Sequence, residues 1–101
     1  MNKSRRKEIY AVCKKLASCK IDKNTLDDII DDIKLILSDE EYYRDNSVPE
    51  NMTNKYEKAD EACDNLSNAI YELKSALSIK NAQQVSLRID KAIEYLYEAS
   101  I

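Results

Sequence analysis

Residues 26–37 read Leu-Asp-Asp-Ile-Ile-Asp-Asp-Ile-Lys-Leu-Ile-Leu. Apolar residues recur in this stretch at intervals of three and four, which is the spacing of one face of an α-helix. Most of the positions between them carry charges, so one face is apolar and the other is charged. The stretch therefore predicts an amphipathic helix with an apolar stripe made of Leu26, Ile29, Ile30, Ile33, Ile36 and Leu37.

Apolar stripes with helical spacing also lie on both sides of this stretch. The first falls between Lys3 and Lys20 and comprises Ile9, Val12, Cys13, Leu16 and Ala17. The longest is rich in alanine, which lets neighbouring helices approach closely, and comprises Ala59, Ala62, Cys63, Leu66, Ala69, Ile70, Leu73, Ala76 and Leu77. The last follows a phase slip at residues 78–81 and comprises Ala82, Val85, Ile89, Ala92, Ile93 and Leu96. The absence of glycine argues against an all-β fold, because tight hairpin turns usually need it.

The clearest break in the chain is the polar stretch 45–51, which contains the only proline, Pro49. The stripes also lapse near residues 22 and 80. Helix-capping residues occur there, with Asn24 or Thr25 at the first lapse and Asn81 at the second. Each half of the chain is either one flawed helix or two helices, with a break favoured in the first half. We expect a single all-α domain, residues 1–101, forming an antiparallel helical hairpin or a four-helix bundle with its main turn near residues 46–53.

The composition argues against catalysis. Histidine, the usual general base at neutral pH, is absent, and a chain without glycine has no phosphate-binding loop. Three cysteines without metal-site spacing favour reduced thiols. Cys13 and Cys63 are expected to be buried, whereas Cys19, which lies among lysines, is the better candidate for a reactive thiol. We expect no enzyme activity, no cofactor and no metal, with the pairs Asp27/Asp31 and Asp28/Asp32 forming a solvated acidic face rather than a cation site.

Charge is segregated along the chain. Residues 1–23 hold eight basic and two acidic residues, whereas residues 24–72 hold fourteen acidic and four basic residues. Such segregation indicates either internal pairing or a surface offered to a partner. Pairing of the basic N-terminal helix with residues 39–41 is favoured in an antiparallel arrangement. The alternative is contact with nucleic acid through Lys3, Arg5, Arg6 and Lys7.

Seven tyrosines supply all the aromatic side chains. They either fill large gaps in the core or contribute to an interface, where tyrosine is favoured. Two of them directly follow an acidic run in the second predicted helix, and such a surface suits competition with DNA for a basic groove. The residues expected to bind a partner are Asp27, Asp28, Asp31, Asp32, Asp39, Glu40, Glu41, Tyr42 and Tyr43.

The main turn also carries a resemblance. The run Val-Pro-Glu-Asn-Met at 48–52, Tyr-Glu-Lys-Ala-Asp-Glu-Ala at 56–62 and Asp-Asn-Leu at 64–66 resemble a pattern in short helical proteins of phages and mobile elements of Gram-positive bacteria. The chain departs from that pattern through extra sequence near residues 18–26 and 79–90. The resemblance implies an origin, viral or mobile, and carries no mechanism with it.

These observations predict a non-enzymatic protein-binding module that inhibits a host protein with a basic surface, as an anti-CRISPR protein does. The alternatives are a nucleic-acid-binding regulator that uses the basic N-terminal helix and a structural protein that assembles with itself. A homodimer is also expected, because a two-arm hairpin would leave part of the alanine-rich stripe uncovered. No apolar run spans a membrane and no signal peptide is seen, so we expect a cytoplasmic protein, in the host cytoplasm if viral, without a membrane partner.

Overall fold

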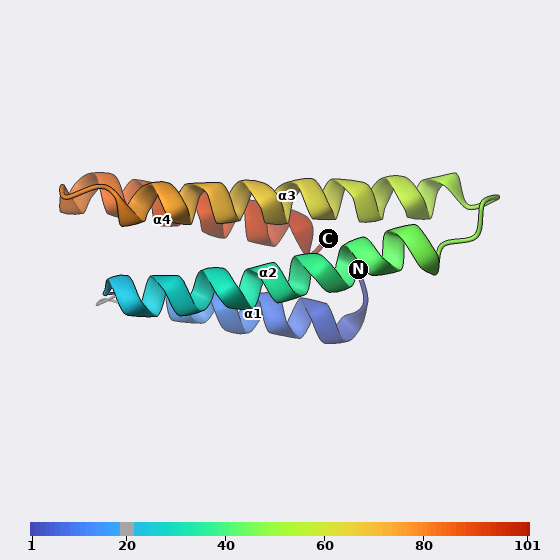
Figure 1. Cartoon of the computed structure of the whole chain (residues 1–101), viewed down its shortest axis with the longest axis horizontal. Helices are drawn as coiled ribbons and strands as arrows, with labels where there is room; N and C mark the ends of the chain where they lie inside the picture. The colour runs from blue at the N-terminus through green and yellow to red at the C-terminus, as the bar shows by residue number, and fades with distance from the viewer. Residues whose placement is uncertain (19–21) are drawn as a thin grey trace.

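The computed structural model describes residues 1–18 and 22–101, and within them the regular structure is four α-helices without a strand. The helices are α1 (Lys3–Ala17), α2 (Lys23–Asn46), α3 (Thr53–Leu77) and α4 (Ala82–Ala99). Each runs antiparallel to the next along the chain (Figure 1). Both α1 and α3 pack on α2 and α4, which makes an elongated bundle of 48 × 19 × 18 Å. The prediction of an all-α fold is confirmed, and each half of the chain consists of two helices.

Side-chain caps mark where three of the helices begin. The Asn2 side chain accepts a hydrogen bond from the Arg5 amide at 2.8 Å, and Asn81 caps α4 by accepting from the Gln83 and Gln84 amides at 2.9 and 3.2 Å. The predicted Asn24 or Thr25 cap of α2 is wrong, because the cap lies two or three residues earlier. Asp22 is its cap, with Oδ1 accepting from the Thr25 amide at 2.7 Å. This hydrogen bond holds the pKa of the Asp22 carboxyl below its usual value.

The main turn lies where it was predicted, between the end of α2 at Asn46 and the start of α3 at Thr53. Pro49 has no amide hydrogen and disfavours the helical conformation in the residue before it, so the helix cannot continue through this point. The Met52 amide donates to the Pro49 carbonyl at 2.9 Å and closes the turn. Because α2 and α3 are the longest helices, this end projects beyond α1 and α4 (Figure 1).

Most residues of the predicted stripes form the core, whereas Ala17 and Ala82, at an end of their stripes, are exposed and their assignment to a buried face is wrong. The largest fully buried apolar side chains come from all four helices and are Ile9, Ile29, Ile33, Leu66, Leu73 and Leu96. The alanine-rich stripe of α3 is covered as well, since Ala59, Ala69 and Ala76 are at most 2% exposed. The uncovered stripe that suggested a homodimer is therefore absent in the bundle. Self-association itself stays a prediction.

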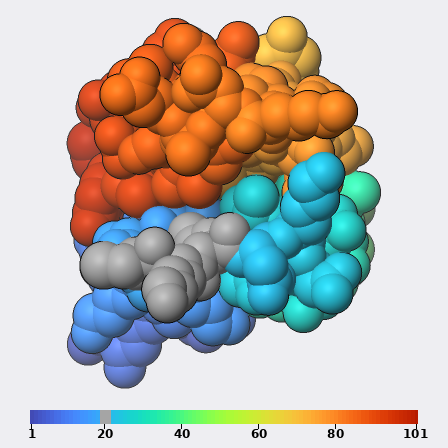
Figure 2. Space-filling model, turned by 90° about the vertical axis from the view of Figure 1, so that its left-hand side faces the viewer, coloured from blue at the N-terminus to red at the C-terminus, as the bar shows by residue number. Residues whose placement is uncertain are grey.

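The end of the bundle opposite the main turn packs less tightly. Here α1 and α3 end and α2 and α4 begin, and the α3–α4 connection lies above the α1–α2 end in Figure 2. Val85, Ile89 and Ile93 are only partly buried there, around a hollow of about 800 Å³. The fully buried residues of α4 come later in the helix and are Ala92, Leu96 and Ala99. The predicted reactive thiol, Cys19, lies outside the described residues.

Candidate partner-binding surface

The predicted acidic residues lie on α2. Because the isoleucine stripe of this helix faces the core, Asp27, Asp28, Asp31, Asp39 and Glu41 are exposed. The Asp32 side chain is 46% exposed, Tyr42 is 68% exposed, and Tyr43 is partly buried. The structure therefore brings eight of the nine predicted residues to the surface of one helix, with different degrees of exposure.

Glu40 is the exception, and its prediction as a partner-binding residue is wrong. Its side chain has no exposed surface. Arg5 Nε donates to Glu40 Oε2 at 2.6 Å, and the Met1 amino nitrogen lies 3.8 Å from Oε1. Glu40 lies four residues after Ile36 and seven after Ile33, so it continues the buried stripe of α2. That spacing is the sequence signal that identifies it as internal.

Arg5 is held internally by the same contacts. Besides its ion pair with Glu40, its guanidinium carbon lies 5.4 Å from the centre of the Tyr43 ring, within the range of a cation–π contact. These contacts attach the start of α1 to the last third of α2. Arg5 is therefore engaged within the protein, as is Tyr43 in part, and nucleic-acid contact through Arg5 stays a prediction.

The other basic residues at the start of α1 are arranged differently. Lys3, Arg6 and Lys7 are exposed, and none of them forms an ion pair within residues 1–18 and 22–101. The predicted internal pairing of the N-terminal cluster with residues 39–41 is confirmed for Arg5 alone. Nucleic-acid contact through the remaining three stays a prediction.

One line of residues runs along the outward face of α2, and we call it the acidic stripe: Asp28, Asp32, Leu35, Asp39 and Tyr42. The successive spacings of four, three, four and three keep these positions on one side of the helix. Leu35 lies at its centre and is 68% exposed. Asp32 is 3.6 Å from Lys15 of α1, but both side chains are about half exposed, so this ion pair contributes little stability.

A shallow groove of about 430 Å³ runs beside the acidic stripe, between α1 and α2. Its lining comes equally from the two helices and consists of Glu8, Ala11, Val12, Lys15, Asp32, Leu35, Ile36 and Asp39. The sequence-based set contains only Asp32 and Asp39 of these and missed Glu8, Ala11, Val12, Lys15, Leu35 and Ile36. Leu35 carried a usable signal, because it is a large apolar residue outside the predicted stripe. Ala11 and Glu8 carried none, since only the packing of α1 on α2 places them in the groove.

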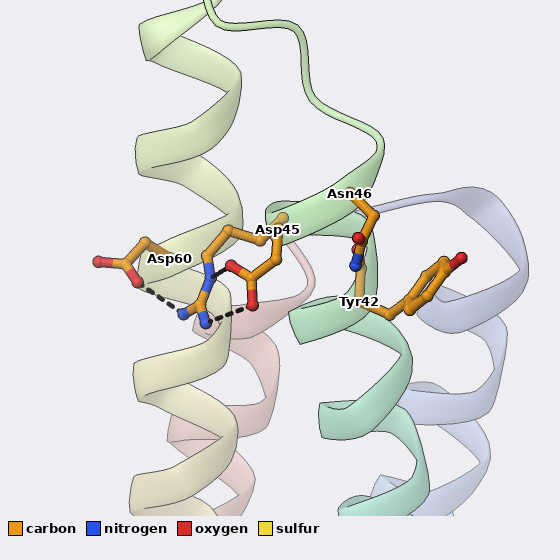
Figure 3. A network of polar contacts seen from close by, with 5 residues as sticks. Tyr42, Asp45, Asn46 and Asp60 are labelled. Carbon is orange, nitrogen blue, oxygen red and sulfur yellow. Dashed lines mark hydrogen bonds and ion pairs between the residues drawn. The ribbon is translucent and has the colours of Figure 1, made fainter.

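A polar network lies on the side of α2 opposite Tyr42 of the acidic stripe (Figure 3). Arg44 Nε donates to Asp45 at 2.8 Å, and Nη1 donates to Asp60 of α3 at 2.8 Å (Figure 3). The guanidinium holds the pKa of the Asp45 carboxyl below its usual value. In Figure 3 the Tyr42 ring points away from this network, on the other side of α2. Arg44 therefore ties the end of α2 to α3, while Tyr42 remains at the surface.

Most tyrosines do not fill gaps in the core, so that interpretation is wrong for them. Five are 44–68% exposed, namely Tyr10, Tyr42, Tyr56, Tyr71 and Tyr97. The rings of Tyr10 and Tyr97 lie 6.3 Å apart across the α1–α4 contact. Only Tyr42 of these five lies on the acidic stripe.

The two described cysteines are buried and free, as predicted. Burial raises the pKa of both the Cys13 and the Cys63 thiol to about 11. Both thiols are therefore protonated at neutral pH and act as small apolar side chains. Within residues 1–18 and 22–101, no group of three or more Cys, Asp or Glu side chains is placed to hold a metal ion. No helix there has the length and hydropathy needed to cross a bilayer.

Comparison with known proteins finds no match: no family model, no curated protein and no solved structure matches this chain. The resemblance to phage proteins, and the origin that it implies, stay predictions. A function is therefore proposed from the acidic stripe and the groove beside it.

Proposed function

We propose that this four-helix bundle is a non-enzymatic binding protein that uses the acidic stripe of α2 to bind a basic surface on another protein. The carrying observation is that Asp28 and Asp39 are exposed and make no ion pair within the described residues, although basic residues are abundant on α1. Carboxylates without an ion pair among the described residues are available to steer a positively charged partner.

The concrete form that we propose is inhibition of a host protein, with the stripe occupying a basic groove that otherwise binds nucleic acid. The acidic side chains of the stripe, Asp28, Asp32 and Asp39, follow one another at about one and two helical turns and present charge along a line, as a nucleic-acid backbone does. Tyr42 adds a large exposed aromatic surface at the end of the stripe. The resemblance to phage proteins supports an anti-defence role in the cytoplasm of a host cell.

Charge reversal tests this function. In co-purification of the tagged protein from host lysate, we expect Asp28→Lys/Asp39→Lys to lose at least tenfold of the captured basic partner. The matched control is Glu57→Lys/Asp64→Lys on α3, which changes net charge equally at two other exposed positions. Thermal stability should stay level or rise slightly, because like charges at i, i+4 cost roughly 0.2–0.5 kcal/mol and Asp28→Lys removes one such pair. Equal capture by both variants would contradict the proposal.

A further inference from the structure

The groove between α1 and α2 has an apolar floor. Ala11 and Val12 contribute from α1, and Leu35 and Ile36 contribute from α2. Val12 and Ile36 are buried members of the core, whereas Leu35 and Ala11 are exposed above them. An isolated exposed leucine is common on protein surfaces. Here Leu35 lies beside a hollow of about 430 Å³ whose floor is also apolar. A side chain from another molecule can be inserted beside Leu35.

The rim of the groove is acidic. It carries Glu8 and Asp39 towards one end and the Lys15–Asp32 pair towards the other. Glu8 and Asp39 form no ion pair within the described residues, and the one lysine on the rim already has a partner in Asp32. Exposed Asp28 extends the same line by one turn beyond Asp32. A ligand that fits this rim must therefore bring positive charge.

The length of the site indicates the shape of the ligand. From Asp28 to Asp39 the helix rises by about 16 Å, at roughly 1.5 Å per residue, which corresponds to three helical turns. Apolar contacts in the middle with basic contacts along one side are the pattern of an amphipathic helix laid in a groove. The acidic rim disfavours nucleic acid.

We propose that the α1–α2 groove binds a basic amphipathic helix that lines the basic groove of the partner protein, with its apolar residues beside Leu35 and its lysines or arginines facing Glu8, Asp39 and Asp28. This inference rests on the proposed function and specifies the partner's chemistry. It requires α1 as well as α2, whereas the proposed function requires only the acidic stripe.

The test uses synthetic peptides and the full chain. The probe is a fluorescent Leu/Lys peptide of about four helical turns, roughly 14 residues at 3.6 per turn, patterned to be amphipathic. A second peptide has the same composition in scrambled order, without an apolar face. Fluorescence anisotropy measures the affinity of each peptide, at low and at high salt.

The groove variants are Leu35→Gln for the floor and Glu8→Lys for the α1 side of the rim. The matched controls are Leu87→Gln on α4, where Leu87 is 55% exposed, and Glu57→Lys on α3. We expect the amphipathic peptide to bind the native protein at least tenfold more tightly than the scrambled peptide. Each groove variant should lose at least fivefold in affinity, and each control less than twofold. Circular dichroism checks that the variants remain helical.

Three results would overturn the inference. Equal binding of both peptides would show that charge alone suffices, and the proposed function would survive through the acidic stripe. Binding that is unaffected by Leu35→Gln and Glu8→Lys would place the peptide elsewhere. Absence of peptide binding, together with a dimer in sedimentation that Leu35→Gln dissociates, would show that a second copy occupies the groove. The proposed function is tested separately, by the lysate experiment with Asp28→Lys/Asp39→Lys.

Discussion

At the scale of single residues, Glu40 places a carboxylate without exposed surface in the contact between α1 and α2. Removing a carboxylate from water costs several kcal/mol, and the attraction of a well-placed cation offsets this cost. Arg5 supplies that cation at 2.6 Å and is itself only 13% exposed. The pair therefore specifies how the start of α1 lies along α2, and its two members depend on each other.

We expect Glu40→Ala to lower the free energy of unfolding by about 3–5 kcal/mol, because Arg5 then keeps a largely buried charge without its partner. Urea denaturation followed by circular dichroism measures the change. The double variant Arg5→Met/Glu40→Leu should be as stable as the native protein or more stable, since an apolar pair needs no desolvation of charge. Glu41→Ala, an exposed neighbour, is the control and should change stability by no more than about 0.5 kcal/mol. Equal effects of Glu40→Ala and Glu41→Ala would contradict a role for the pair.

At the scale of elements, α4 is held unevenly along its length. Its C-terminal half contributes all of its fully buried residues, while its first turns border the hollow at the end of the bundle. The start of the helix depends correspondingly on its cap, in which the Asn81 side chain accepts from two backbone amides. Local opening is expected where few apolar contacts oppose it.

Replacing the cap tests this dependence. Asn81→Ala should cost about 1 kcal/mol, within the usual range of 0.5–2, because two amides lose their acceptor. Asn81→Asp should retain most of the stability, since aspartate caps equally well. Hydrogen exchange should accelerate at residues 83–86 in the alanine variant and remain slow in the second half of α4. Asn68→Ala, at an exposed position inside α3, should leave exchange at residues 83–86 unchanged. Uniform acceleration throughout α4 would show that the helix opens as one unit instead.

At the scale of the whole molecule, the core contains two thiols whose pKa of about 11 lies above the ordinary value of 9.0. The cause in each case is burial, which disfavours the thiolate. The folded protein therefore keeps its thiol protons over a range in which the unfolded chain loses them. Below pH 9 the thiols leave the free energy of unfolding at its full value. As the pH rises towards 11 they lower it, because proton release then favours the unfolded state.

Urea denaturation between pH 7 and pH 11 measures this decline, under reducing conditions and in a Cys19→Ser background that removes the remaining thiol. The Cys13→Ala/Cys63→Ala variant should be less stable at pH 7, because it lacks two buried sulfur atoms, and its decline above pH 9 should be shallower. All other side chains are the same in both proteins, so the difference between the two curves isolates the thiols. Parallel curves would show that the thiols do not contribute.

The amino-acid sequence by itself determined the features that depend on neighbours along the chain. The spacing of Ile29 and Ile33 predicts a helix and its buried face, Pro49 predicts the main turn, and Asn81 predicts a cap, because each effect acts within about one helical turn. The same helical spacing, continued from Ile33 and Ile36 to residue 40, also indicates a buried position for Glu40. The outward position of the aspartates on α2 follows from the burial of the isoleucines.

Only the tertiary structure decided which groups meet across helices. The choice of a bundle over a hairpin, the pairing of Arg5 with Glu40, and the meeting of Ala11 with Leu35 in one groove depend on how α1 packs against α2. Hydrophobic periodicity predicts which face of a helix is buried. It does not predict which face of another helix that buried face contacts. Burial of apolar surface is nearly non-directional, whereas a charged pair such as Arg5 and Glu40 adds a directional contact between α1 and α2.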